Sequence, residues 1–270
     1  MKGLEEYVEY LCSEELSERT VKLYYRQAQL FIDFLQDRPI TKNELLAYKA
    51  FLKQKLKKAT SINLYIIAVN KFLKFIGMKE CTIKLENIQR RQCCDNIMNV
   101  EEYRRLLHFA HKTGNIKYYC IMKTLALTGI RISELCGCTV EALQQGKFTI
   151  KSKGKIRDIY LPDKLIVDLL NYCYYENIKT GVIFKGNRNT PITCTAVYKM
   201  LIRLADINGV PREKVHPHSF RHLFAVTYMQ QYSNIFELAD ILGHSSVETT
   251  RIYTKTTVSE KRKKMNGLKL

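Results

Sequence analysis

The sequence predicts a mainly α-helical protein of two domains with one small antiparallel β-sheet. Apolar residues recur at helical spacing through residues 1–85, and this periodicity is lost over residues 86–98, where two arginines stand side by side. Residues 148–162 instead alternate β-branched and polar side chains on both sides of a Lys-Gly pair, which predicts a β-hairpin. We therefore expect a helical domain at 1–85, a basic linker at 86–98 and a second domain at 99–270.

The first domain is expected to contain four helices. Ser17 has the position of an N-cap, and Thr41 with Glu44 forms a capping-box signature. Ser61 is the expected start of the last helix, and a glycine at position 77 ends its apolar pattern. The expected helices span about 4–11, 17–35, 41–52 and 61–76.

The second domain is expected to open with a cap formed by Asn99 and Glu102. Apolar periodicity, with polar caps and glycine stops, then predicts helices on both sides of the hairpin. The expected elements are helices near 100–112, 116–128, 163–177, 193–208, 219–231 and 235–242, and a short strand near 182–184.

The charge balance indicates a polyanionic partner. The 270 residues include 44 Lys and Arg against 26 Asp and Glu, a formal net charge of +18. Such a surplus favours DNA or RNA over an acidic membrane surface. No stretch reaches the ~18 apolar residues of a membrane span, and we expect a cytoplasmic, nucleoid-associated protein. The nine cysteines show no paired zinc spacing, so they do not indicate a zinc site.

Residues with phosphate chemistry gather near the C-terminal end. They occur as His218-Ser-Phe-Arg221-His222, then Leu-Gly-His244, then Arg-Ile-Tyr253. A phenol surrounded by cations is a poor core element and a reasonable nucleophile. Upstream, Thr-Gly-Ile-Arg131-Ile-Ser-Glu134-Leu follows an apolar helix and adds a further arginine. Guanidinium groups stay charged and bind phosphate at two points.

Taken in this order, the motifs resemble those of the tyrosine recombinases (phage integrase family), in the compact form of the Xer recombinases. The resemblance covers nearly the whole chain. It implies an N-terminal helical core-binding (SAM-like) domain and a C-terminal catalytic domain, which together form a C-shaped clamp around DNA. It also implies a site-specific recombinase that cleaves and rejoins strands through a 3′-phosphotyrosine and a Holliday junction, without metal or cofactor. Integration, excision, inversion and dimer resolution all stay open.

The resemblance gives each residue of the motifs a role. Tyr253 is the expected nucleophile, and Arg131 and Arg221 are expected to bind the phosphate oxygens. His218 and His244 are expected either to donate to the phosphate or to relay the tyrosine proton. Lys153 at the hairpin tip is the expected general acid, with its neighbours Lys151 and Lys155 left open as alternatives. Glu134 and His222 are expected to support the pocket. A metal cluster of His216, His218 and His222 is an alternative, but no carboxylate or thiolate nearby completes it.

The expected partner is double-stranded DNA with an inverted-repeat core site. A homo-tetramer would hold two duplexes, one dimer per site, with or without a second recombinase. A basic helix face is usually just solvated, but the resemblance favours phosphate contacts. The candidate DNA-contact residues are Lys49, Lys53, Asn63, Asn70, Lys71, Arg90 and Arg91. The rival functions are a type IB topoisomerase-like enzyme and a DNA-binding regulator or architectural protein that does not cut.

Overall fold

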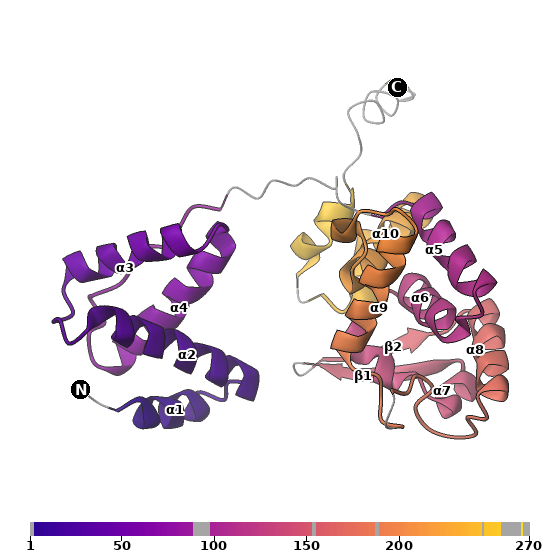
Figure 1. Cartoon of the computed structure of the whole chain (residues 1–270), viewed down its shortest axis with the longest axis horizontal. Coiled ribbons are helices and arrows are strands. Elements are labelled where there is room, and N and C mark those ends of the chain that lie inside the picture. Colours follow the sequence, from indigo (N-terminus) through magenta and orange to yellow (C-terminus); the bar gives the residue numbers. More distant parts are fainter. Residues whose placement is uncertain are drawn as a thin grey trace. The chain divides into compact units, whose positions relative to one another are not determined.

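The computed structural model describes residues 3–88, 98–152, 155–186, 189–244, 246–254 and 266. The chain forms two compact units, Met1–Arg91 and Gln92–Leu270 (Figure 1). Within the described ranges the structure is mostly helical with a single two-stranded antiparallel sheet, as the sequence predicts. No helix in these ranges is long and apolar enough to cross a membrane.

The first unit packs its helices around aromatic side chains. Phe31 and Tyr48 meet edge to face in its core, as do Tyr7 and Phe72, and such pairs add to the stability that burial provides. The side chain of Ser17 accepts a hydrogen bond from the backbone of Thr20, which confirms the expected cap. The helices are α1 (Leu4–Ser13), α2 (Glu18–Leu35), α3 (Lys42–Lys55) and α4 (Ala59–Phe75).

The last helix of this unit begins earlier than the sequence indicates. α4 starts at Ala59, two residues before the expected Ser61, and its N-cap, Lys58, makes no side-chain capping bond. Ser61 therefore lies inside the first turn, where its backbone N–H bonds to the carbonyl of Lys58. The error arose because a serine is a good cap in general, whereas here the apolar face of α4 packs on α2 and fixes the start.

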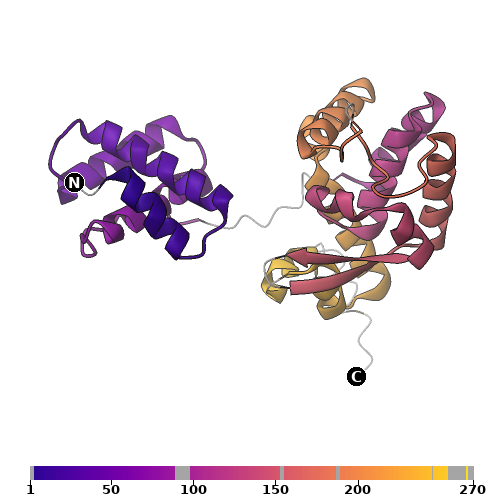
Figure 2. The same cartoon turned by 90° about the horizontal axis from the view of Figure 1, so that it is seen from below.

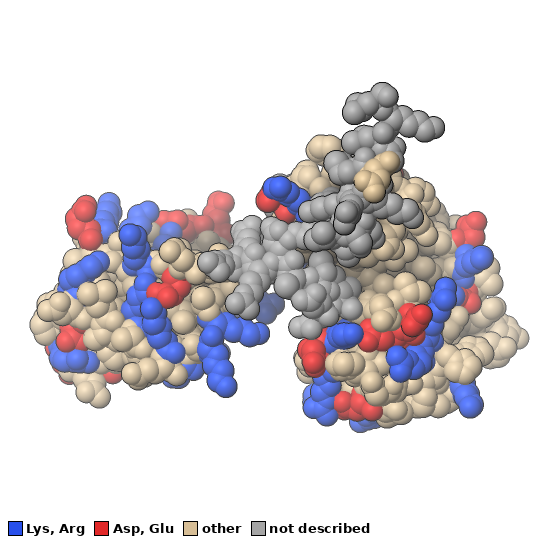
Figure 3. Space-filling model, turned by 90° about the horizontal axis from the view of Figure 1, so that it is seen from above, with Lys and Arg blue, Asp and Glu red and all other residues tan. Residues whose placement is uncertain are grey.

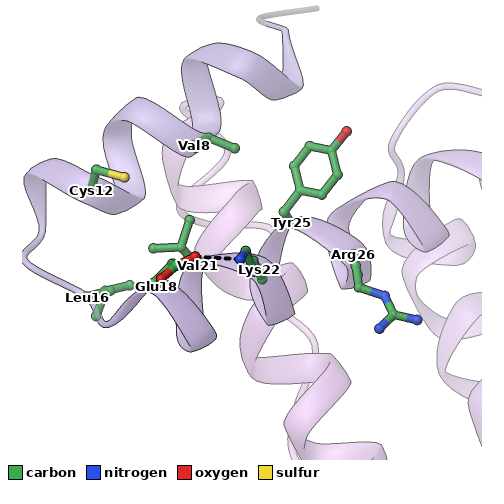
Figure 4. A pocket seen from close by; sticks show the side chains of 8 residues that line it. All are labelled: Val8, Cys12, Leu16, Glu18, Val21, Lys22, Tyr25 and Arg26. Atoms are coloured by element: carbon green, nitrogen blue, oxygen red, sulfur yellow. Dashed lines mark hydrogen bonds and ion pairs between the residues drawn. The ribbon is translucent and has the colours of Figure 1, made fainter. Parts of the chain in front are cut away.

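A hollow of about 670 Å³ lies between α1 and α2 of the first unit (Figure 4). Val8 and Cys12 reach it from α1, and Val21 and Tyr25 from α2. Its polar lining includes the ion pair of Glu18 and Lys22, at 2.5 Å. The lining is mainly apolar and carries none of the residues expected to handle phosphate.

The second unit is built around α6, which packs against α5, α8 and α10. Its core includes Leu125, Phe184, Leu201 and Phe220, all fully buried. The principal elements are α5 (Val100–Lys112), α6 (Ile116–Thr128), α7 (Val140–Gln145), β1 (Lys147–Ser152), β2 (Lys155–Tyr160), α8 (Asp163–Tyr175), α9 (Cys194–Ile207), α10 (Pro217–Tyr232) and α11 (Ile235–Leu242). The described part of the unit also contains the 3₁₀ segments η1 (Ile132–Gly137), η2 (Arg212–Lys214), η3 (Val247–Thr249) and η4 (Arg251–Thr254).

The predicted hairpin is confirmed, and the predicted strand at 182–184 is wrong. β1 and β2 pair in antiparallel register from Lys147 opposite Tyr160 to Ser152 opposite Lys155. In Figure 2 the hairpin lies beside the gold segment that contains α11, which contacts β2. Val182 forms only an isolated antiparallel bridge with Thr139. The neighbouring Ile183 and Phe184 are fully buried, and the backbone N–H of Ile183 donates to the carbonyl of Cys138.

Two more boundaries differ from the sequence-based expectation. α10 begins at Pro217 and not at Ser219, because proline suits the first turn of a helix. Nδ1 of His216 accepts the hydrogen bond from the backbone N–H of Ser219 and so caps this helix. The sequence also predicts a short helix that starts at Ser246 and carries Tyr253 about two turns along, but the segment is not one helix. It forms η3 and then η4, with Tyr253 in the second.

Candidate active site

The guanidinium of Arg221 is fixed between the C-terminal ends of two helices. Its Nη1 donates to the carbonyl of Gly129 after α6 (2.8 Å), and its Nη2 donates to the carbonyl of Leu242 in α11 (2.5 Å). Terminal helix carbonyls lack intrahelical partners and carry partial negative charge, so they suit a cation. Arg221 is only 4% exposed. Burial, with nearby Arg131 and Arg157, lowers its pKa to about 10, which still leaves it charged at neutral pH.

Glycine is required at both of these helix ends. Gly129 and Gly243 have φ values of 61° and 63°, in the left-handed region that glycine enters without strain. A Cβ atom on Gly129 would lie 2.5 Å from the ring of Phe224, and one on Gly243 would lie 2.2 Å from Nη1 of Arg157. The Thr-Gly and Leu-Gly pairs of the motifs therefore allow the chain to turn tightly where Arg221 is held.

Glu134 connects two arginines. Its carboxylate accepts hydrogen bonds from Nη1 of Arg131 (3.0 Å) and from Nη2 of Arg157 (2.8 Å), and also from the backbone N–H of Arg131 (2.7 Å). Glu134 is buried, whereas the side chain of Arg131 is 33% exposed. Arg131 is therefore oriented by a buried carboxylate and still reaches the surface. The predicted supporting role of Glu134 rests on these contacts.

Sequence reasoning missed Arg157. It lies on β2 opposite Ile150, and the buried Ile159 two residues later is on the same face of the strand. A charged residue in an inward position of the hairpin was the available signal. Burial lowers the pKa of Arg157, and the carboxylate of Glu134 partly offsets that effect.

Two histidines of the motifs are held in neutral form. Burial lowers the pKa of His218, and Arg221 and Arg131 add to the effect. Burial and the same arginines lower the pKa of His244 to about 4. Nδ1 of His244 lies 2.7 Å from Oγ1 of the buried Thr250. This bond leaves Nε2 for another partner, and Thr250 is a second residue that sequence reasoning missed.

The hydroxyl of Tyr253 is hydrogen-bonded to Nδ1 of His222 at 2.6 Å. Tyr253 is 8% exposed and packs with Ala225, Leu238 and Leu242. We expected His222 to support the pocket, and its contact is with the tyrosine. Arg221 is close enough to Tyr253 for their charges to interact.

The structure thus brings together most of the predicted catalytic set. Hydrogen bonds and charge interactions connect Arg131, Glu134, His218, Arg221, His222, His244 and Tyr253. Lys153 lies outside the described residues, so its expected role as general acid stays a prediction. Among the residues that the structure describes, no group of three or more His, Cys, Asp or Glu side chains could hold a metal ion.

Comparison with known proteins decides the family. The family model described as "Phage integrase family" matches residues 96–260, and that of the "Phage integrase, N-terminal SAM-like domain" matches residues 4–79. The chain belongs to the phage integrase family. Tyrosine recombinase XerA of Pyrococcus furiosus is 30% identical to this recombinase over 94% of this chain and 89% of its own.

Solved structures agree with this assignment. A crystal structure of XerA recombinase is 29% identical, with a TM-score of 0.57, and the match covers 99% of this chain and 98% of that one. A lambda integrase dimer bound to a COC′ core site shares the fold, with a TM-score of 0.75 at 20% identity over 93% of this chain and 94% of that one. The chain is a tyrosine site-specific recombinase with a SAM-like and a catalytic domain, as the sequence resemblance predicts.

In the first unit of the recombinase, the predicted DNA-contact asparagines bond within the chain. Asn63 donates to the carbonyl of Glu86 (2.9 Å) and accepts from its N–H (2.7 Å). Asn70 makes the same two bonds with Ile83 (3.0 and 2.9 Å). Each side-chain amide thus bonds to a backbone N–H and C=O of the segment 83–86, as a neighbouring strand would, and holds the segment against α4. A base contact would require these bonds to be exchanged.

The predicted lysines of this unit also have partners within the chain. Lys49 and Lys53 both form ion pairs with Glu86, at 2.7 and 3.0 Å. Lys71 pairs with Glu14 at 2.8 Å. On the first unit in Figure 3, acidic side chains lie among the basic ones. Arg90 and Arg91 lie outside the described residues, so the contact residues of this unit stay predictions.

Proposed function

We propose that Tyr253 attacks a phosphodiester of double-stranded DNA and forms a 3′-phosphotyrosyl enzyme. The bond between phosphorus and the 5′ oxygen breaks as the new oxygen–phosphorus bond forms, so the energy of the bond is kept for rejoining. The observation that carries this proposal is a buried tyrosine whose charge interacts with that of an arginine fixed by two helix ends.

The surrounding residues divide the remaining tasks. Arg131 and Arg221 hold the non-bridging oxygens while charge develops. Arg221 does so with the N–H groups that are not bonded to the two backbone carbonyls. His244 donates from Nε2, because Thr250 occupies its Nδ1. His218 takes the phenolic proton, and Lys153 returns a proton to the 5′ oxygen. Glu134 and Arg157 keep Arg131 in place.

We further propose how the enzyme meets DNA. Residues 1–85 and 99–270, joined by the basic linker 86–98, close on a duplex as a C-shaped clamp. One dimer binds each inverted-repeat core site, and a homo-tetramer, with or without a second recombinase, joins two duplexes and exchanges strands through a Holliday junction. The lambda integrase dimer on its core site supports the dimeric unit. Because the substrate is DNA, the enzyme works at the nucleoid in the cytoplasm.

Covalent trapping tests the proposal. The full chain is incubated with EDTA and nicked duplexes from the DNA that flanks its own gene, and a denaturing gel is used to detect a protein–DNA adduct. We expect an adduct with the wild type and with Tyr232→Phe, and none with Tyr253→Phe. Tyr232 is a matched control, since it lies on α10 and is 66% exposed.

Three outcomes would count against the proposal. Tight DNA binding by the wild type without any adduct would favour the non-cutting DNA-binding protein. An adduct that persists in Tyr253→Phe would move the nucleophile to another residue. Relaxation of one supercoiled plasmid without strand exchange would favour the topoisomerase-like alternative.

A further inference from the structure

His222 has a position that its predicted supporting role does not explain. It follows Arg221 directly on α10, yet Arg221 is already held by the carbonyls of Gly129 and Leu242. The ring of His222 turns instead to Tyr253, with 5.4 Å between ring centroids and an interplanar angle of 52°. α10 also packs against η4, which carries the tyrosine. The contact therefore joins α10 to η4 through two residues that are 31 positions apart in the sequence.

We propose that His222 is a positioning residue for the nucleophile, whose Nδ1 accepts the hydrogen bond of the Tyr253 hydroxyl and holds its oxygen beside Arg221. This inference rests on the proposed function. Nδ1 is the atom within hydrogen-bond distance, at 2.6 Å, and a phenol donates well to a neutral imidazole nitrogen. A hydroxyl fixed in this way has fewer orientations to lose when it attacks phosphorus.

The surroundings of His222 favour a positioning role over proton removal. Burial, followed by the effects of His218, His216 and Arg221, lowers the pKa of His222 to about 4. An ordinary phenol has a pKa near 10, so transfer of its proton to this ring is unfavourable by about six powers of ten. His222 thus stays neutral and keeps an acceptor toward the hydroxyl. The proton is left to another group when the oxygen–phosphorus bond forms.

Three substitutions of His222 test whether its hydrogen-bond acceptor or its ring affects cleavage. Asparagine places an amide oxygen near the position of Nδ1, so we expect His222→Asn to retain cleavage within about five-fold of the wild type. His222→Phe keeps a ring against Tyr253 without an acceptor. His222→Gln places its amide farther out, near Nε2. We expect both to slow single-turnover cleavage of a nicked duplex by about 10- to 100-fold at unchanged DNA affinity.

A matched control comes from a second His–Tyr pair of the same unit. The rings of His111 and Tyr119 lie 5.5 Å apart at 62°, and His111 is exposed. His111→Phe is expected to cleave at the wild-type rate. Equal DNA affinity of all variants, measured by fluorescence anisotropy, separates positioning of the hydroxyl from loss of folding.

A substrate with sulfur in place of the bridging 5′ oxygen shows which step is affected. A thiolate leaves without being protonated, so this substrate relieves a missing general acid but not a misplaced nucleophile. We expect Lys153→Ala to regain cleavage on the sulfur substrate and His222→Phe to stay slow on both substrates.

Two results would overturn the inference. One is cleavage by His222→Phe and His222→Gln at the wild-type rate. The other is full recovery of His222→Phe on the sulfur substrate, which would give His222 a role toward the leaving group. If His222→Phe does not fold, equal rates for the Asn and Gln variants would likewise exclude Nδ1. An absent adduct with the wild type, in contrast, would mean that the proposed function itself fails.

Discussion

The two units of this recombinase use their cations in different ways. In the second unit Arg131, Arg157 and Arg221 converge, joined by one carboxylate and by helix-end carbonyls. In the first unit Lys49 and Lys53 share Glu86, and Lys71 faces Glu14. Cations are thus held in a prearranged arginine cluster in the second unit and in locally matched ion pairs in the first.

This difference determines how each unit can bind a phosphate group. Ion pairs at a protein surface contribute little to stability, so a phosphate oxygen can replace Glu86 or Glu14 as the partner of a lysine. The two partners of Arg221 cannot be replaced in this way, because they are buried backbone carbonyls. The second unit is therefore organised before DNA arrives, and the first unit can adapt to DNA as it binds.

The largest expected effect comes from removal of the fixed arginine. Arg221→Met leaves the carbonyls of Gly129 and Leu242 without their donor, which lowers the free energy of unfolding by about 2–4 kcal/mol. Loss of the cation from the phosphate site lowers the cleavage rate by about 1,000-fold. Arg131→Met is the matched control, because the side chain of Arg131 is partly exposed and is held by Glu134 and not by backbone carbonyls at helix ends.

Arg131→Met should lose cleavage to a similar degree, while its free energy of unfolding, measured with urea, changes by less than about 1 kcal/mol. Equal destabilisation by the two substitutions would mean that the two helix-end bonds do not fix Arg221. The contrast between a prearranged and an adaptable unit would then lose its main support.

The second expected effect is a difference between the two units in how their stability depends on pH. All six histidines lie beyond residue 107, so the first unit has none. In the folded second unit the pKa values of His222 and His244 fall from the ordinary 6.5 to about 4. Between these pH values the unfolded chain binds more protons than the folded one. Stability is therefore complete above pH 6.5 and is lost as the pH falls toward 4.

The slope is at most about 1.4 kcal/mol per pH unit for each of these histidines, and contact with solvent reduces it. The lowered pKa values of Glu14 and Glu86 confine losses in the first unit to pH values below about 4.5. Hydrogen exchange of peptides from each unit at pH 7 and pH 5, corrected for intrinsic rates, measures the difference. Equal loss of protection in both units at pH 5 would contradict it.

Local signals explain which features the sequence predicted correctly. The caps at Ser17 and Asn99 and the end of α11 at Gly243 depend on residues within one turn, and the structure confirms them. The hairpin was predicted because its alternation spans only a few residues. The set of motifs could be assembled because the family resemblance connects residues far apart in the chain.

Contacts between distant segments explain what the sequence missed. Arg157 reaches Glu134 across 23 residues, and Asn63 reaches Glu86 across the same number. Neither pair produces a periodic pattern or a cap. The inward position of Arg157 in the hairpin could have drawn attention to that residue, but nothing in the spacing indicates its partner. The preference of His222 for Tyr253 was hidden for a related reason. Adjacent helix positions such as 221 and 222 point in different directions, and only the packing of η4 shows what the second one meets.

The smallest expected effect tests whether the lysines of the first unit are available to DNA. Glu86→Gln removes the ion partner of Lys49 and Lys53, while the backbone of residue 86 keeps its two bonds to Asn63. We expect binding to non-specific duplex at low salt to tighten by about three- to ten-fold, and the dependence of log K on log salt to steepen by up to about two.

Glu80→Gln is the matched control for that measurement, since it removes the same charge from an exposed position of the same unit. If Lys49 and Lys53 bind phosphate once released, only Glu86→Gln changes the salt dependence, because counterion release counts the phosphates that are neutralised. An equal change in both variants would instead reflect net charge alone. Lys49 and Lys53 would then stabilise the folded unit without exchanging Glu86 for a phosphate when DNA binds.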